Sequence, residues 1–308
     1  MIIGAMMTKL ELPSSAALRL SDWGLIRAQG EDAAKFLHGQ LTQDFALLGT
    51  EQARLAGFCS AKGRLLATLV GWKDGAHDVL LALPAELLPA VLKRLSMFVM
   101  RAKCKLSDAS DELALWGLIE PEQDGARWSL ARTGAQTRIR LPDGGACSRW
   151  LLVQAPDAEA PSETVLSAQD WAWLEAKAGL AWVRSATQEQ FVPQMLNLEL
   201  LGGVNFQKGC YPGQEVVARS QYRGTLKRRT FLYELQGQAQ PGQEIFHSED
   251  PGQPAGLVAL AAAHADGCSL VLAETKIAAL DTGSLHLGSA DGPLLSPRAL
   301  PYELKALD

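Results

Sequence analysis

The sequence from Phe206 to Arg219, FQKGCYPGQEVVAR, combines two glycines, one proline and one cysteine between an apolar segment and a helix-like run. Gly209 and Gly213 allow backbone dihedral angles that residues with a Cβ atom avoid. Pro212 has the φ angle that suits the first position of a helix. The stretch therefore predicts a shaped turn that leads into a short helix.

Cys210 is expected to lie just before the N-terminus of this helix. The positive end of the helix dipole and the nearby Lys208 would then favour a thiolate over a thiol. The alternative is a strand-to-helix connection in which Cys210 is a small buried side chain, because free cysteine is among the most buried residue types. The composition of the turn alone leaves both interpretations open.

The same stretch contains the pattern K-G-C-Y-x-G-Q-E, followed by an arginine. This pattern resembles the signature of the YgfZ family of folate-binding proteins, which are relatives of the aminomethyltransferase of the glycine cleavage system. Other segments resemble the family too: GQLTQD at 39–44, AKGR at 61–64, the PQ-x-x-NL segment at 193–198 and LPY at 300–302. The residues that match the signature are Lys208, Gly209, Cys210, Tyr211, Gly213, Gln214, Glu215 and Arg219.

The resemblance implies an α+β fold, an aminomethyltransferase-like multidomain arrangement of antiparallel sheets and helices followed by a small C-terminal β-barrel. We expect residues 1–227 to form the folate-binding region, as two interleaved α+β subdomains, and residues 228–308 to form the barrel. The local pattern agrees, because short β-like runs punctuated by glycine and proline begin at Thr230.

Periodicity predicts the main elements upstream. A hairpin is expected from 54–60 and 64–72, joined at Gly63, and amphipathic helices are expected over 84–100 and 167–179. Ser167 and Asp170 are spaced as a capping box at the start of the second helix. Thr187 and Gln190 have the same spacing, which predicts a short helix that Pro193 ends.

Composition limits the class of protein. The 308 residues are 47% hydrophobic and 20% charged with a net charge of −5, which is typical of a globular chain of two or three domains and argues against a dedicated nucleic-acid binder. No apolar run reaches the roughly 18 residues that a membrane helix needs. We therefore expect no membrane association.

The five cysteines are far apart in the sequence and form no Cys-x-x-Cys motif, and the five histidines are scattered singly. This spacing predicts neither a disulfide framework nor a zinc or iron–sulfur site, so no protein-bound metal is expected. Reduced cysteines fit a cytoplasmic protein.

A folate ligand needs an aromatic wall for its flat pterin ring and a few fixed polar groups. Trp23 and Trp171 match positions that the resemblance implicates in folate contact, and Glu199 lies where aminomethyltransferases have a glutamate that holds the pterin. The alternatives are two core tryptophans and an exposed helix glutamate.

The resemblance also allows a check for the acidic residue that the aminomethyltransferase reaction, here called the parent reaction, requires. Aminomethyltransferases have an acidic residue on the strand after the hairpin, and the corresponding positions here are Ala67 and Thr68. Neither side chain is a carboxylate, so the parent reaction is expected to be absent. The alternative is a folate-dependent aminomethyl or methylene transferase with a relocated carboxylate, for example Asp44 or Glu199.

Basic residues gather between Lys208 and Arg229, with six basic residues against one acidic residue, a net charge of +5. Such a cluster predicts an anion site for a folate polyglutamate tail, an RNA or an acidic protein surface, or else a solvated linker.

The resemblance implies a cytoplasmic accessory protein that binds tetrahydrofolate or another folate and supports iron–sulfur cluster assembly or repair in client proteins, and thereby tRNA modification. Cys210 is then the candidate reactive thiol, and the folate stacks between Trp23 and Trp171. Direct binding of tRNA to the basic cluster is a further hypothesis.

Overall fold

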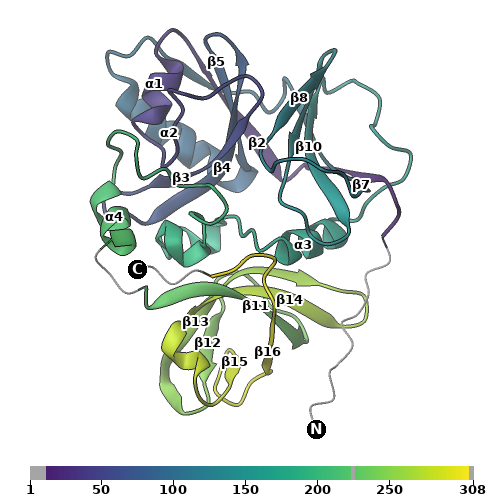
Figure 1. Ribbon diagram of the computed structural model, residues 1–308, viewed down its shortest axis with the longest axis vertical. Helices are drawn as coiled ribbons and strands as arrows, with labels where there is room; N and C mark the ends of the chain where they lie inside the picture. Colours follow the sequence, from purple (N-terminus) through teal and green to yellow (C-terminus); the bar gives the residue numbers. More distant parts are fainter. Residues whose placement is uncertain (1–11, 223–225, 305–308) are drawn as a thin grey trace.

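The computed structural model describes residues 12–222 and 226–304, and these form three sheets whose strands pair antiparallel (Figure 1). The first sheet contains, in spatial order, β3 (Ala53–Cys59), β4 (Leu65–Gly75), β5 (Asp78–Pro84), β2 (Trp23–Gln29) and β6 (Lys105–Asp108). The second contains β1 (Ala16–Arg19), β7 (Ala114–Pro121), β10 (Cys147–Gln154), β9 (Gln136–Arg140) and β8 (Leu130–Thr133). This confirms the expected α+β fold built on antiparallel sheets.

The third sheet is C-terminal and curls into a half-barrel below the other two in Figure 1. Its strands in spatial order are β15 (Leu285–Leu287), β12 (Glu244–His247), β13 (Asp250–Ala263), β14 (Cys268–Lys276), β11 (Arg228–Gln236) and β16 (Leu295–Arg298). Tyr233, Ile245 and Val271 belong to its own core, so the small C-terminal β structure is confirmed in this form. The division into 1–227 and 228–308 stays a prediction, although β11 begins at Arg228.

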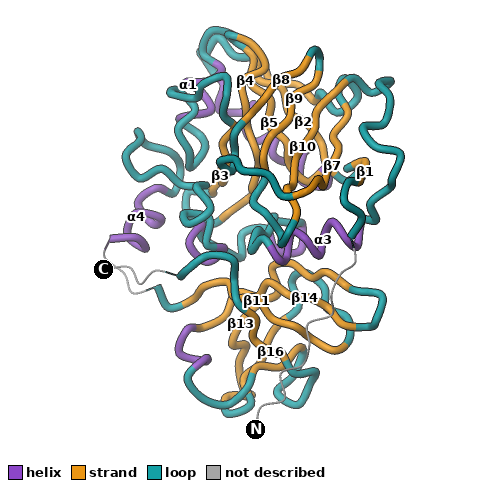
Figure 2. Tube along the Cα trace, turned by 45° about the vertical axis from the view of Figure 1, so that its right-hand side comes forward, coloured by secondary structure: helices purple, strands orange, loops and turns teal. Residues whose placement is uncertain are grey.

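The hairpin of β3 and β4 is the expected one, and Gly63 at its turn has a φ of +70°. Four α-helices accompany the sheets in the described ranges: α1 (Ala33–His38), α2 (Leu88–Val99), α3 (Ala168–Lys177) and α4 (Gln214–Tyr222). The Ser167 hydroxyl accepts a hydrogen bond from the Asp170 N–H, which confirms that cap of α3. Figure 2 shows α3 between the second sheet and the C-terminal sheet. No helix in these ranges is long and apolar enough to cross a membrane.

The prediction of a short helix between Thr187 and Pro193 is wrong. Single 3₁₀ turns occupy Ser185–Thr187 and Pro193–Leu196 instead, so Pro193 begins a turn that it was expected to end. Proline fits the start of a turn because the N–H group that it lacks makes no hydrogen bond in the first turn of a helix. Two further 3₁₀ turns, Ala85–Leu87 and Ile277–Leu280, complete the short elements.

Candidate functional site

The signature forms a tight corner, residues 208–213, that fits against the β3–β4 turn. Gly213 has a φ of +81°, and a Cβ atom there would lie 2.4 Å from the Ser60 carbonyl oxygen and 2.6 Å from the Gly63 Cα. Two glycine turns therefore interlock through their backbones. Gly209, in contrast, has no positive φ, so only Gly213 uses the conformation that glycine allows. Pro212 lies in the turn two residues ahead of α4 and does not occupy its first position.

Lys208 fastens the corner to the end of α1. Its side chain is buried, and Nζ donates hydrogen bonds to the carbonyl oxygens of His38 (2.5 Å), Leu41 (3.0 Å) and Gly209 (3.2 Å). The ammonium also lies 4.7 Å from the ring centroid of Tyr211. Burial lowers the pKa of Lys208 to about 8, against the attraction of Asp44. Lys208 is therefore an internal clamp and not part of an exposed anion site.

A histidine–aspartate pair lies beside the corner. His38 Nδ1 is 3.0 Å from Asp44 Oδ1, which also accepts the Leu47 N–H at 2.9 Å. Burial raises the pKa of Asp44, but the hydrogen bonds from Leu47 and His38 outweigh it, so the pKa lies below its ordinary value. A Cβ atom built on Gly209 would meet His38 Nε2 at 3.4 Å. Because an ionised Asp44 can only accept a hydrogen bond, the Nδ1–H group of His38 donates to it, and Nε2 is the ring nitrogen that faces the corner.

Cys210 is the exposed member of the five cysteines, whereas Cys59, Cys147 and Cys268 are buried. Burial raises the pKa of the Cys59 thiol to about 12, as expected for a structural cysteine. Cys210 comes four residues before α4 begins and next to the glycine that faces His38. The arrangement presents one accessible thiol on a fixed backbone, and it answers the question of burial that the turn composition left open.

The remaining signature residues lie on α4. Glu215 and Arg219 are exposed, and Gln214 is half-buried. Val217 anchors the helix in the core, and its carbonyl accepts a hydrogen bond from Gln194 Nε2 at 2.8 Å. The helix thus presents charged residues to solvent while its inner face fixes the corner.

The two expected folate-contacting tryptophans are both in the core, with 8% of Trp23 and 4% of Trp171 exposed. Trp23 packs edge-on against Trp182, with ring centroids 4.8 Å apart, and the Arg149 guanidinium lies 4.3 Å from the ring of Trp171. Glu175 of α3 joins the two, since it accepts the Trp182 Nε1–H at 2.8 Å and lies 3.8 Å from Arg149 Nη2. The tryptophans therefore belong to one buried network, which we call the tryptophan cluster.

This cluster keeps donors that have no hydrogen-bond partner among the described residues, namely Arg149 Nε and Nη2 and Trp171 Nε1. Burial raises the pKa of Glu175, against the nearby positive charge of Arg149. Unsatisfied buried donors carry a free-energy cost of about 1–3 kcal/mol each, so a ligand with acceptor oxygens would gain by reaching them. Gly117 packs on Trp171, because a Cβ atom there would lie 2.8 Å from the indole.

Four cavities with described linings have volumes of about 480, 270, 320 and 190 Å³, and none includes Trp23, Trp171 or Cys210 in its lining. Arg149 lies over the Trp171 ring and Gly117 packs against it, so a flat ring that stacks on this indole requires one of them to shift. The structure does not bring Cys210 into contact with the tryptophan cluster.

Glu199 is buried and held by a neighbour from β11. Arg229 Nη1 donates to Glu199 Oε1 at 2.8 Å and to Asn197 Oδ1 at 2.9 Å. Burial raises the pKa of Glu199, and Arg229 opposes that shift. The alternative of an exposed helix glutamate is wrong, because Glu199 lies in a turn and its side chain is only 5% exposed. Glu199 links the signature region to the C-terminal sheet.

Three of the six basic residues in the cluster are engaged inside the protein. Lys208 is buried on carbonyl groups, Arg228 pairs with Glu274 at 2.6 Å, and Arg229 pairs with Glu199. Arg219 and Lys227 are exposed, and Arg223 lies outside the described residues. Charge counted along the sequence therefore overstates the anion site.

The two positions that the resemblance aligns with the carboxylate of aminomethyltransferases are occupied by buried residues that support the fold. Ala67 and Thr68 on β4 are fully buried, and Thr68 Oγ1 accepts the Val183 N–H at 2.9 Å. This pairing holds the segment after α3 against the first sheet and leaves no acid at that point.

Sequence reasoning missed two pairs, His38–Asp44 and Arg149–Glu175. His38 lies at the end of α1 and Asp44 only six residues later, so a turn at Gly39 was a usable signal for their contact. The signal for the Arg149–Glu175 pair was weaker, because it consisted of one charged residue inside a mostly apolar strand. Buried charges of that kind are paired, but the sequence does not name the partner.

The chain matches no family model. The crystal structure of the glycine cleavage system aminomethyltransferase T from Bartonella henselae superposes with a TM-score of 0.73 at 17% identity, over 96% of this chain and 88% of that one. That likeness shows the aminomethyltransferase fold.

Two curated relatives align over nearly their whole length. The tRNA-modifying protein YgfZ of Klebsiella pneumoniae is 32% identical, over 95% of this chain and 96% of the relative. The protein of the same name from Sodalis glossinidius is 30% identical, over 96% and 97%. Together with the signature corner, these alignments show that the chain belongs to the family of YgfZ tRNA-modifying proteins.

Proposed function

We propose that this protein is a cytoplasmic, tetrahydrofolate-binding accessory protein that supports iron–sulfur cluster assembly or repair in client enzymes and thereby tRNA modification. The observation that carries the proposal is the exposed Cys210 on the interlocked corner, whose neighbour Gly209 faces His38 of the His38–Asp44 pair. A nucleophilic thiol needs access, a fixed backbone and a nearby base. Cys210 is exposed on a fixed turn, and His38 faces the neighbouring residue Gly209, so we expect His38 to act as the base.

Folate binding draws on the tryptophan cluster. Trp171 under Arg149 supplies an aromatic surface beside a cation, and the unpartnered donors of both residues suit the carbonyl and ring acceptors of a pterin. Trp23 reaches the same network through Trp182. We expect Glu199 to contribute only after its pair with Arg229 opens.

An aminomethyltransferase reaction is the less favoured function. The parent acid is replaced at Ala67 and Thr68, and the two carboxylates that could replace it are already engaged. Asp44 is bound to His38 and the Leu47 N–H, while Glu199 is bound to Arg229. A carboxylate that assists attack has to reach the substrate, so accessory function fits these contacts better.

Titration with tetrahydrofolate tests the ligand. The wild-type protein is expected to bind in calorimetry, and Trp171→Phe and Trp23→Phe are expected to weaken the affinity about tenfold through loss of indole contact. Trp116→Phe is the matched control, because Trp116 lies outside the cluster against Arg19. Absence of binding by the wild type, or equal affinity in all variants, would overturn the folate site.

The cellular role has its own test. Cells that lack the gene are complemented with wild-type protein, Cys210→Ser or Cys104→Ser, and thiolated tRNA nucleosides are quantified by mass spectrometry. The proposal expects Cys210→Ser to lose most of the restored modification, whereas Cys104→Ser retains it. Measuring turnover of an aminomethyl donor with folate bound separates the two functions, since steady turnover would favour the transferase.

A further inference from the structure

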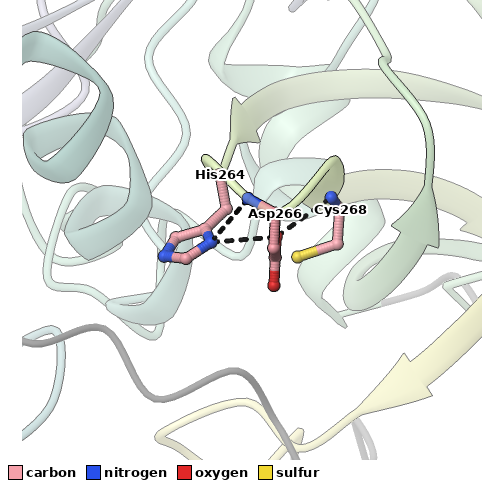
Figure 3. Close-up of side chains that lie close together, drawn as sticks. All are labelled: His264, Asp266 and Cys268. Carbon is pink, nitrogen blue, oxygen red and sulfur yellow. Dashed lines mark hydrogen bonds and ion pairs between the residues drawn. The ribbon is translucent and has the colours of Figure 1, made fainter.

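Three side chains with metal-ligand chemistry meet at the turn between β13 and β14. Figure 3 shows the carboxylate of Asp266 between the imidazole of His264 and the sulfur of Cys268. One ligand atom from each residue lies within 4.8 Å of the other two. They follow one another at alternate positions of a hairpin turn, a spacing that neither Cys-x-x-Cys nor a helical histidine pair describes.

Local hydrogen bonds hold the turn in shape. The His264 N–H donates to the Cys268 carbonyl at 2.8 Å, the Cys268 N–H donates to Asp266 Oδ1 at 3.2 Å, and Gly267 has a φ of +86°. The His264 ring lies 5.0 Å from the ring of Trp173 on α3. The three ligands are thus positioned before any ion arrives, which lowers the entropic cost of binding one.

The three side chains of the cluster lie at different depths below the surface. The sulfur-bearing side chain is buried at its base, whereas the side chains of His264 and Asp266 are 17% and 39% exposed. His264 Nδ1 and Asp266 Oδ1 are already 2.9 Å apart. This geometry gives an entry path from solvent at the rim and a soft donor at the bottom.

We propose that His264, Asp266 and Cys268 form a binding site for a divalent transition-metal ion of the zinc class, with the fourth position open to solvent. Imidazole, carboxylate and thiolate are the ligands that Zn²⁺ takes at about 2.0–2.3 Å, which places tetrahedral ligand atoms about 3.3–3.8 Å apart. Ion binding would therefore draw together the ligand atoms that are up to 4.8 Å apart and separate His264 Nδ1 from Asp266 Oδ1, which lie 2.9 Å apart, by rotation of the side-chain torsions. The thiol loses its proton to solvent as the metal–sulfur bond forms.

The ligand set also predicts selectivity. Sulfur and imidazole favour Co²⁺, Zn²⁺ and Cu²⁺ over cations that prefer oxygen. Mg²⁺ and Ca²⁺ are therefore expected not to compete. The expectation of no protein-bound metal rested on sequence spacing, and the fold brings together residues that this criterion does not count.

Cobalt titration tests the site on the full chain. The Cys210→Ala protein is used as background, because it lacks the exposed thiol that could bind cobalt by itself. One Co²⁺ per chain is expected, with a thiolate-to-cobalt charge-transfer band in the near ultraviolet, displaced by Zn²⁺ and accompanied by release of one proton. A thousandfold excess of Mg²⁺ leaves the band unchanged.

Variants assign the ligands. Cys268→Ser is expected to abolish the band, and His264→Gln and Asp266→Asn to weaken the affinity at least tenfold, while His286→Gln on the same sheet has no effect. Asparagine keeps an Oδ1 acceptor for the Cys268 N–H, so the turn is retained. The proposal is overturned if no band forms up to about 100 μM Co²⁺, or if the band and affinity survive both Cys268→Ser and His264→Gln. If Cys268→Ser fails to fold, His264→Gln at the accessible rim is the deciding variant, and unchanged cobalt affinity in it overturns the proposal.

Discussion

Two turns in this protein carry a cysteine and a positive-φ glycine, yet their cysteines are in opposite environments. The corner at 208–213 exposes Cys210, whereas the β13–β14 turn at 264–268 buries Cys268. Gly213 and Gly267 have nearly the same φ, +81° and +86°. A Cβ atom on Gly213 would strike the backbone of the β3–β4 turn, but nothing lies within 4 Å of one on Gly267.

The difference shows how each turn gets its shape. The corner depends on distant parts of the chain, because Lys208 bonds to the carbonyls of His38 and Leu41 and Gly213 touches Gly63. The hairpin turn is held by its own local hydrogen bonds. Tertiary support from behind leaves the corner's outer side accessible, which suits a thiol that reacts with another molecule. A self-supported turn can bury its thiol and use it as a fixed ligand.

Alanine at the two glycines should produce the largest contrast. Gly213→Ala combines a left-handed backbone with a backbone clash, and we expect it to lower the free energy of unfolding by about 3–4 kcal/mol. Gly267→Ala has the same φ but open space, so a loss of only about 1 kcal/mol is expected. Urea unfolding of both variants measures the difference. Equal losses would mean that the interlocked glycines do not shape the corner.

The reactivity of the two thiols should also differ strongly. Cys268 and Cys59 react only after local opening, and an opening free energy of about 3 kcal/mol slows alkylation by about 100-fold relative to an exposed thiol. Native-state alkylation followed by mass spectrometry should therefore label Cys210 at least 100-fold faster. In denaturant the rates should converge. Comparable native rates would remove the reason for assigning Cys210 a reactive role.

The sequence was sufficient for the elements that depend on local pattern. The hairpin at Gly63, the cap at Ser167 and the apolar face of α2 follow from turn chemistry and periodicity, and the fold class followed from the signature. The exception, at Pro193, arose because proline suits both the start and the end of a helix. Local patterns therefore located the elements, but at Pro193 they did not show whether an element begins or ends.

The candidate site was predicted less well because its contacts span long stretches of sequence. Lys208 was counted as a surface charge, but its partners lie 167 and 170 residues away. A folate was expected to stack between Trp23 and Trp171, but the described contacts connect the two indoles through Trp182, Glu175 and Arg149. Charge and aromatic content can be counted in a sequence, whereas the depth and partners of each side chain depend on the tertiary fold.

Loss of the Lys208 ammonium should destabilise the corner. Lys208→Met keeps the aliphatic volume but leaves the buried carbonyls of His38 and Leu41 without their shared donor, at an expected cost of about 2 kcal/mol. Lys227→Met is the control, since Lys227 is exposed, and a change within about 0.5 kcal/mol is expected. Chemical denaturation measures both. A neutral Lys208→Met would show that the corner is held by Gly213 alone.

The smallest effect is expected at Asp44. Asp44→Asn keeps an acceptor for the Leu47 N–H but removes the charge that pairs with His38, at an expected cost of about 1 kcal/mol at neutral pH. Because the pKa of Asp44 is lowered in the folded protein, its contribution is present above the pKa of the unfolded chain and disappears as the pH falls through the folded value. The difference between variant and wild type should therefore be constant near neutral pH and shrink below about pH 4. Exposed Asp124→Asn should show no such difference, and a gap that persists in acid would mean that Asp44 acts by packing and not by its charge.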